Sequence, residues 1–484
     1  MGEVIPHWLS KQAFLSPDQP AMEQVDGTMI TFQQLKEESQ TFAKKLAAVG
    51  INKGEHIAIL SNNNVQMIIA IHALSYLGAV AVLLNTRLTS EELNYQISDA
   101  DVKAIIYHEQ LSEQTKALLA DIKKSFKDVE AEHEKNIQLV SELNLDDPFT
   151  IIYTSGTTGF PKGVIHTYGN HWWSAIGSAL NLGISDRDKW LAVLPYFHVG
   201  GLSIFVKSVI YGMPVYVVEK FNEQIVLDAI VNRGVTIASV VTVMVQRLLD
   251  SLGENSFPEH FRCMLLGGGP APVPLLEKAN SKNVPVFQSF GMTETSSQIV
   301  TLSPRDALHK VGSAGKALFP AQVKIQQSEP NQIGEILVKG PMVTKGYYNH
   351  TKANENSFHD GWLLTGDLGY VDDEGFLYVV DRRKDLIISG GENIYPSEIE
   401  SVLSGFEGVK EIGVTGKKDD YWGQVPVAFI VPHHKQVKKE DILTYAKDKL
   451  AKYKLPKEIY FVDSLPRNAS NKLVRANLLD LMDG

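Results

Sequence analysis

The stretch YTSGTTGFPKG, residues 153–163, places glycines, hydroxyl side chains and one lysine directly after an apolar segment. Residues 149–155, FTIIYTS, predict a buried strand that runs into a loop. Glycines let a backbone curl close to a ligand and point N–H groups inward, while hydroxyls add donors and lysine adds a positive charge. We therefore expect this loop to bind a polyphosphate through Thr154, Ser155, Gly156, Thr157, Thr158, Gly159 and Lys162.

Two alternative interpretations of this loop are weaker. The P-loop of kinases and NTPases has the pattern G-x-x-x-x-G-K-[ST], but Pro161 replaces its second glycine and Gly163 replaces its magnesium-binding hydroxyl. A flexible surface loop is the other alternative, because polar glycine-rich loops are common. A dense mixture of donors directly after a core strand favours a binding loop over it.

Strand and helix patterns alternate on both sides of the loop. Residues 31–49 predict an amphipathic helix, and residues 56–61, 102–108, 235–241 and 263–269 predict strands. Continuous apolar strands between helices are typical of parallel sheets covered on both faces, so the fold class expected is α/β.

The pattern changes after about residue 319. Short segments between tight turns predict antiparallel strands there, and with them a small β-barrel-like part of the N-terminal region. Residues 396–404 and 439–450 predict helices of an α+β unit. We expect a large N-terminal domain, residues 1–382, with several α/β subdomains, and a smaller C-terminal domain, residues 383–484.

Composition excludes several classes of protein. The 46 Lys and Arg residues against 56 Asp and Glu residues give a formal charge of −10, so binding of a nucleic-acid backbone is not expected. A hydrophobic content of 44% excludes a disordered chain. The one cysteine, Cys263, excludes an intrachain disulfide and fits a reducing, cytoplasmic compartment.

Residues 61–86 carry no charge and imitate a membrane span. A spanning helix needs ~20 apolar residues, so length alone does not exclude one. Gln66 and His72 interrupt the apolar run, however, and Gly78 is a suitable helix stop. The pattern therefore predicts a helix, a glycine and a buried strand of a core α/β unit, with no membrane span.

The stretch YTSGTTGFPKG resembles the phosphate loop of the adenylate-forming superfamily, which includes acyl-CoA synthetases, peptide-synthetase adenylation domains and beetle luciferases. Further segments match that superfamily in order and spacing, so the resemblance covers essentially the whole chain. These segments are LPYFHVGGL (194–202), LLGGGPAP (265–272), QSFGMTET (288–295), LLTGDLGY (363–370), DRRKDLIISGGENIYPSEIE (381–400) and SLPRNASNKLVR (464–475).

The resemblance implies an ATP site. Glu294 would bind Mg²⁺, a hard cation that prefers carboxylate oxygen and bridges phosphates. Phe290 would stack on adenine, although the superfamily usually has tyrosine there, so any phenol hydrogen bond is lost. The other implied contacts are Gly268 and Gly269 along adenine, Gly291 and Met292 in the pocket wall, Thr293 at a phosphate, and Asp367 and Arg382 at the ribose.

The resemblance also implies the catalytic residues. Lys472 matches the catalytic lysine, although Asn471 stands where glycine usually precedes it. His198 would lie at the carboxylate end of the acyl pocket, and Thr158 and Lys162 complete the expected catalytic set.

A mobile C-terminal domain follows from the same resemblance. Lys384 falls at the hinge, and Gly390 and Gly391 would form a narrow passage for coenzyme A. A carboxylate is a poor electrophile, so the implied reaction has two steps: the acid and MgATP give acyl-AMP and pyrophosphate, and the CoA thiol then attacks. ATP, Mg²⁺ and coenzyme A are the expected cofactors and partners.

The segments SFGMTETSSQIVTLSP and especially LPRNASNK resemble the o-succinylbenzoate–CoA ligases of menaquinone biosynthesis. That resemblance implies 2-succinylbenzoate as the acid, whose second carboxylate needs donors; His198, Ser297 and Gln298 are candidates. Three alternatives stay open: another acyl- or aryl-CoA ligase, an adenylation enzyme that loads a carrier protein, and a non-enzymatic nucleotide-binding module. A homo-oligomer is compatible with the sequence but is not indicated by it.

Overall fold

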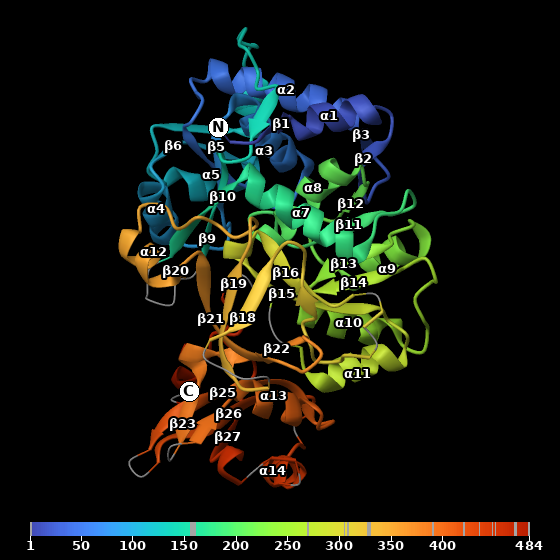
Figure 1. Cartoon of the computed structure of the whole chain (residues 1–484), viewed down its shortest axis with the longest axis vertical. Helices are drawn as coiled ribbons and strands as arrows, with labels where there is room; N and C mark the ends of the chain where they lie inside the picture. Colours follow the sequence, from blue (N-terminus) through green and yellow to red (C-terminus); the bar gives the residue numbers. More distant parts are fainter. Residues whose placement is uncertain are drawn as a thin grey trace.

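The structure is a computed structural model that describes residues 2–154, 161–268, 271–303, 305–306, 309–326, 331–389, 392–419, 422–434, 436–447, 449–450, 452–468 and 472–482. The side chains of residues 382, 383, 392 and 393 are outside this description. The N-terminal elements form a large upper part, and the elements from β23 onward form a smaller lower part (Figure 1). The expected α/β fold, with a large N-terminal region and a smaller C-terminal domain, is confirmed.

The strand before the phosphate loop belongs to a six-stranded sheet. Five of its strands run parallel, and the strand after the loop pairs antiparallel at the edge. In order across the sheet they are β10 (Lys162–Thr167), β9 (Pro148–Thr154), β5 (Val80–Leu84), β4 (His56–Leu60), β6 (Val102–Tyr107) and β7 (Ile122–Ser125).

Helix α3 (Val65–Leu77) occupies the segment that imitates a membrane span. The Asn64 side chain caps its start by accepting a hydrogen bond from the Met67 N–H at 2.8 Å. Gly78 ends it in the left-handed conformation, with φ at 68°, before strand β5. Nearly all of its side chains are buried, with Gln66 exposed, which explains why apolar residues occur on every face. Within the described part of the chain, no helix has the length and apolarity needed to cross a membrane.

A nine-stranded sheet forms the second half of the N-terminal region. Six central strands are parallel, and antiparallel strands extend both edges. Side chains alternate along the strands, so Trp190 packs into one core and Leu191 into another. The strands, in order, are β17 (Lys316–Ala317), β16 (Ser297–Thr301), β15 (Val286–Met292), β14 (Cys263–Leu266), β13 (Ile237–Val240), β11 (Trp190–Ala192), β12 (Val215–Val217), β2 (Pro20–Gln24) and β3 (Met29–Thr31).

Helices pack against both faces of this sheet. The expected helix at residues 31–49 is confirmed as α2, where Thr31 and Gln34 form a capping box. One core holds α9, α10 and α11, and the other holds α1, α2, α3, α7 and α8. Their bounds are α1 (Trp8–Leu15), α2 (Phe32–Ala48), α7 (Tyr168–Leu182), α8 (Val199–Tyr211), α9 (Glu223–Asn232), α10 (Thr242–Leu252) and α11 (Val273–Ser281).

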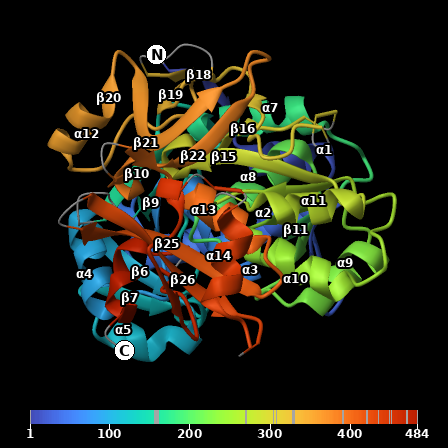
Figure 2. The same cartoon turned by 90° about the horizontal axis from the view of Figure 1, so that it is seen from below.

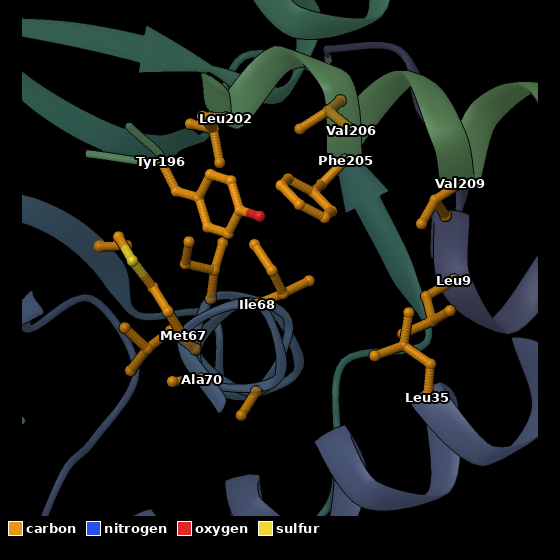
Figure 3. Close-up of a cluster of buried hydrophobic side chains, with 14 of the residues drawn as sticks. Leu9, Leu35, Met67, Ile68, Ala70, Tyr196, Leu202, Phe205, Val206 and Val209 are labelled. Carbon is orange, nitrogen blue, oxygen red and sulfur yellow. The ribbon is translucent and has the colours of Figure 1, made fainter. Parts of the chain in front are cut away.

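The two sheets share one hydrophobic core. Figure 3 shows Leu202 and Phe205 of α8 directed toward Ile68 of α3. Tyr196, just before α8, packs edge-on against Phe205 with ring centroids 4.5 Å apart. This core holds the start of α8, where His198 lies, in a fixed position relative to both sheets.

A five-stranded antiparallel sheet follows, as the change of pattern after residue 319 predicted. The C-terminal domain then has a second five-stranded sheet with helices packed on it, and Figure 2, seen from below, shows it in front of both halves of the N-terminal region. The elements are β18 (Gln322–Ile325), β19 (Gly334–Lys339), β20 (Phe358–His359), β21 (Trp362–Val371), β22 (Leu377–Arg382), β23 (Ile387–Ser389), β24 (Glu392–Ile394), α13 (Pro396–Ser404), β25 (Val409–Asp419), β26 (Gly423–Pro432), α14 (Lys439–Lys447) and β27 (Glu458–Phe461).

Candidate active site

The expected phosphate loop connects two antiparallel strands. Thr154 of β9 lies opposite Lys162 of β10, so both residues stand at the base of the loop. The Tyr153 hydroxyl donates to Asp99 Oδ2 at 2.7 Å and anchors this base to α4 (Ser90–Asp99). A P-loop runs from a strand into a helix, so the hairpin excludes that alternative. The loop residues Ser155, Gly156, Thr157, Thr158 and Gly159 lie outside the described residues.

Tyr347 connects the base of the loop to the expected metal ligand. The centroid of its ring lies 4.9 Å from Lys162 Nζ, and its hydroxyl donates to Glu294 Oε1 at 2.9 Å. Burial and the adjacent Glu294 carboxylate raise the pKa of Tyr347 well above its usual range. Sequence reasoning missed this residue, because a tyrosine in the turn GYYNH has no pattern that separates function from packing.

Glu294 lies in the tight turn between β15 and β16. Met292 lies opposite Ser297 in the register of these strands. A Cβ atom on Gly291 would stand 2.1 Å from Ser297 O, so this close approach requires glycine. Phe290 precedes it and is buried. The turn thus brings together the residues expected at adenine and at the metal.

His166, on β10, holds the backbone of Thr293. Its Nε2 lies 2.6 Å from Thr293 O. Because a carbonyl only accepts, Nε2 carries the hydrogen, and Nδ1 accepts from Thr150 Oγ1 at 3.2 Å. Burial lowers the pKa of His166 to about 4, so the ring is neutral near pH 7. This contact fixes the Thr293–Thr295 turn against the phosphate-loop hairpin, and sequence reasoning missed it.

Lys472 reaches the N-terminal region from the C-terminal domain. Its N–H donates to Asn468 Oδ1 at 2.9 Å, and the flanking residues Arg467 and Leu473 form a β-bridge. A Cβ atom on Gly268 would stand 3.8 Å from Lys472 Cε, so the lysine side chain lies beside the glycine segment expected at adenine. Gly269 and Asn471 lie outside the described residues.

His198 lies within electrostatic range of Lys472. It is the N-terminal cap residue of α8. Burial, followed by the positive charges of Lys472 and Arg87, lowers the pKa of His198 to about 4. The structure therefore brings Gly268, His198 and Lys472 together from three distant parts of the sequence, with a neutral imidazole near the lysine charge.

The residues expected at the ribose lie on neighbouring strands. Asp367 of β21 is directly opposite Arg382 of β22. The Asp367 N–H donates to Thr365 Oγ1 at 3.1 Å, which holds the turn before it. Lys384 follows within two residues, in the short 3₁₀ helix Arg383–Asp385, and is exposed. Gly390 and Gly391 lie outside the described residues.

Ser297 and Gln298 belong to a buried polar cluster that contains an unexpected lysine. Gln298 Oε1 accepts from Lys207 Nζ at 2.9 Å and from Ser297 Oγ at 2.6 Å, and Gln298 Nε2 donates to Ser178 Oγ at 2.9 Å. Lys207 is 2% exposed, and within the described residues no carboxylate forms an ion pair with it. Burial lowers the pKa of Lys207 to about 7. Sequence reasoning missed this lysine, although a single charged residue inside the apolar segment SIFVKSVIY indicates a buried charge.

The described residues contain no group of three or more His, Cys, Asp or Glu side chains that could hold a metal ion. This does not conflict with magnesium, which commonly binds through one or two carboxylates together with substrate phosphates. Glu294, buried and adjacent to the phosphate-loop hairpin, is a donor of the required kind.

Comparison with known proteins also identifies an AMP-binding enzyme, over nearly the whole length of the chain. A family model described as AMP-binding enzyme matches residues 9–348, and one described as AMP-binding enzyme C-terminal domain matches residues 398–472. The chain is 60% identical to a 2-succinylbenzoate–CoA ligase of Oceanobacillus iheyensis, covering 99% of this chain and 100% of that protein. It is 52% identical to the corresponding ligase of Bacillus anthracis, covering 100% of both.

Solved structures of o-succinylbenzoate CoA synthetase from Bacillus subtilis are also similar. The complex with the acyl-adenylate intermediate has a TM-score of 0.94 at 48% identity and covers 98% of both chains. The complex with ATP and magnesium has a TM-score of 0.93 at 48% identity, covering 99% of this chain and 100% of that one. A double mutant bound to a product analogue has a TM-score of only 0.77 at 48% identity, covering 99% and 98%. The chain is therefore more similar overall to the acyl-adenylate and ATP complexes than to the product-analogue complex.

Proposed function

The chain belongs to the family of AMP-binding enzymes, and on this premise we propose that it is an ATP-dependent ligase that joins 2-succinylbenzoate to coenzyme A. The products are 2-succinylbenzoyl-CoA, AMP and pyrophosphate, which places the enzyme in menaquinone biosynthesis, with a cytoplasmic location. One observation carries the chemistry: Lys472 stands beside Gly268, where its charge acts on His198. The similarity to named ligases over the full length supports the acid.

In the first half-reaction the acid carboxylate attacks the α-phosphate of ATP. Both groups are anionic, so the site must offset their repulsion. We propose that Lys472 lies between them and stabilises the charge that develops, while neutral His198 orients the carboxylate without adding charge. Lys162 and the hydroxyls of residues 154–158 would hold the other phosphate oxygens.

We propose Glu294 as the protein ligand of Mg²⁺. When bound, the metal would neutralise charge on the phosphates and orient them. His166 holds the backbone next to Glu294, and Tyr347 holds its carboxylate, so the ligand is oriented from two sides. The proposed nucleotide contacts are Gly268, Gly269, Phe290, Gly291, Met292 and Thr293 around adenine and phosphate, and Asp367 and Arg382 at the ribose.

Replacing Tyr347 with phenylalanine should raise the KM for MgATP roughly tenfold, because a hydrogen bond to a charged group contributes about 1.5–3 kcal/mol. The KM for the acid should stay unchanged. Pyrophosphate release at varied MgATP measures the effect. Tyr348→Phe is the matched control, since the Tyr348 hydroxyl donates to Asp101 at the surface. An unchanged KM for MgATP in Tyr347→Phe would contradict the proposed role.

We propose that Lys207 pairs with the second carboxylate of the diacid. A buried cation without a counter-charge is unfavourable, and a dianionic substrate would supply the missing charge. Gln298 holds Lys207 and Ser297 on one amide oxygen, so these three side chains form one preorganised cluster. His198 and Lys207 are both carried by α8, which would place the two ends of the acid along that helix.

The Lys207 ammonium should make acid binding depend on pH. Its pKa is lowered to about 7, so the charged form in the free enzyme prevails only below pH 7. The KM for 2-succinylbenzoate should therefore rise by about tenfold per unit as the pH increases from 7 to 9. Lys207→Met should remove this dependence and raise the KM about 30-fold at pH 7.

Monoacid analogues provide the control for this prediction. Two analogues each lack one of the two carboxylates. For any analogue that the enzyme converts, the KM of Lys207→Met should equal the KM of the wild type. A KM for the diacid that is flat between pH 7 and 9, or unchanged in Lys207→Met, would contradict the pairing.

We propose that residues 383–484 turn about Lys384 between the two half-reactions, which divides the chain into domains 1–382 and 383–484. The turn would withdraw Lys472 and bring Gly390 and Gly391 to the site as the passage for coenzyme A. Two structures of one relative support this, because their TM-scores to this chain differ, 0.94 with an acyl-adenylate and 0.77 with a product analogue.

ATP–pyrophosphate exchange with a panel of acids tests the proposed function. Exchange should be fastest with 2-succinylbenzoate, and coenzyme A rather than a holo-carrier protein should accept the acyl group. Exchange with a fatty or aryl acid alone would make the chain another acyl-CoA ligase. No exchange with any acid, despite ATP binding, would favour a non-enzymatic nucleotide-binding module.

A further inference from the structure

A buried charge cluster forms around Arg475, close to Lys472 in the sequence. Arg475 follows the lysine by three residues and is 14% exposed in its side chain. Its guanidinium contacts Glu400 of α13 at 2.6 Å, Asp385 at 3.1 Å and Asp381 at 3.5 Å. One cation therefore meets three carboxylates within the described residues.

These carboxylates fall on opposite sides of the proposed hinge. Asp385 and Glu400 follow Lys384 in sequence, so they would move together with Arg475. Asp381 precedes it, at the end of β22 in the N-terminal domain. The Arg475–Asp381 contact is thus the one ion pair of this cluster that crosses the hinge.

Two hydrogen bonds of Ser397 also cross the proposed hinge next to Asp381. The Ser397 N–H, at the start of α13, donates to Asp381 Oδ2 at 2.9 Å. The Ser397 hydroxyl donates to the carbonyl oxygen of Val380. Asp381 therefore contacts the C-terminal domain through both carboxylate oxygens, Oδ2 by the hydrogen bond and Oδ1 by the ion pair, and the aspartate is buried between the two domains.

Asp381 is also next to the expected ribose site. Arg382 follows it directly and lies opposite Asp367, while Asp381 itself lies opposite Leu368. Contacts thus run from the strands of the expected ribose site through Asp381 to Arg475, which follows Lys472 by three residues in the sequence. We propose that Asp381 is a positioning residue which, through Arg475, holds Lys472 in place for adenylation and is released for the thioester step. This inference rests on the proposed two-step function.

The charges of the cluster lead us to expect that the fold tolerates loss of the Asp381 charge. Burial opposes the charge of Arg475, but Glu400 foremost and then Asp381 raise its pKa above the usual value. Burial raises the pKa of Glu400, Arg475 pulls it back, and Asp381 adds to the rise. Without the Asp381 charge, Arg475 still has two carboxylates and Glu400 loses a repulsive neighbour. Asp381→Asn should therefore keep the fold, whereas removing Arg475 would leave Glu400 buried and unpaired.

The test compares two half-reactions in the full-length enzyme. Asp381→Asn should slow acyl-AMP formation about tenfold, measured by ATP–pyrophosphate exchange. Thioester formation from supplied acyl-AMP and coenzyme A should stay equal or rise. Asp385→Asn is the matched control: it removes the same charge from the same arginine, but on the moving side of the hinge. Its ratio of half-reaction rates should equal that of the wild type.

An unchanged ratio in Asp381→Asn, whether or not both rates fall, would overturn the proposal, because a merely structural role affects both steps. If Asp381→Asn does not fold, Asp381→Ser, which also removes the charge but keeps an oxygen acceptor, should shift the ratio of the half-reaction rates in the same direction, and no shift would again overturn the proposal. The ratio of the two half-reaction rates is measured with whichever acid supports exchange in the wild type. If 2-succinylbenzoate is not a substrate, the wild type alone shows this, and the test of Asp381 is unaffected.

Discussion

Replacing Lys472 with alanine is expected to lower the rate of acyl-AMP formation by about 10²–10³-fold, because preorganised stabilisation of developing charge is usually the largest single term in catalysis. The lysine side chain stands beside Gly268 and near His198, where the carboxylate and the α-phosphate would meet. Thioester formation from supplied acyl-AMP is expected to continue near the wild-type rate, because the proposed hinge motion removes Lys472 from the site before that step.

ATP–pyrophosphate exchange and thioester formation measure the two half-reactions of Lys472→Ala separately. Lys410→Ala is the control, since Lys410 is an exposed lysine on β25 of the same domain. Equal loss of both half-reactions in Lys472→Ala would contradict its assignment to the first step. The pKa of His198 gives a readout independent of turnover. Burial and then Lys472 lower it, so imidazole titration by NMR should show a small rise in the variant.

Most of the fold follows from local patterns. Residues 65–84 read as helix, glycine and strand, and the structure has α3, a left-handed Gly78 and β5 at those positions. The helices at 31–49 and 396–404 were equally visible, because hydrophobic periods act over one or two turns. The antiparallel strand β10 was not predicted, because pairing direction depends on where the chain turns after residue 154.

The site also contains residues that the sequence could predict and residues that it could not. Lys472, His198 and Gly268 stand in segments whose order and spacing carry a family resemblance, so they could be named before their proximity was known. Lys207 and Tyr347 stand in no such segment. Their importance arises from partners, Gln298 and Glu294, that lie 91 and 53 residues away. Sequence periodicity reports that a side chain is buried, but it does not report which polar group it meets.

Replacing Glu294 with glutamine is expected to lower kcat/KM for MgATP by about 10²–10³-fold, an effect comparable to the loss of one preorganised electrostatic contact. Magnesium binds carboxylate oxygen far better than amide oxygen when phosphates supply its remaining ligands. The amide oxygen of glutamine still accepts the Tyr347 hydroxyl, which lies 2.9 Å from Glu294 Oε1. The fold should therefore survive, since exchanging a buried charge for a neutral group of the same shape removes a desolvation penalty.

Titration of Mg²⁺ at fixed ATP measures this prediction, and thermal unfolding controls for the fold. The half-saturating Mg²⁺ concentration should rise in Glu294→Gln, and excess Mg²⁺ should restore part of the rate. A variant with wild-type Mg²⁺ dependence and a lowered melting temperature would make Glu294 a structural acid instead.

The double variant Tyr347→Phe/Glu294→Gln separates the tyrosine from the metal ligand. If Tyr347 acts only by holding the Glu294 carboxylate, its removal has nothing left to disturb once that carboxylate is gone. The double variant should then equal Glu294→Gln in kcat/KM for MgATP. Additive losses would mean that Tyr347 also acts elsewhere, and its ring 4.9 Å from Lys162 Nζ identifies where that second contribution would arise.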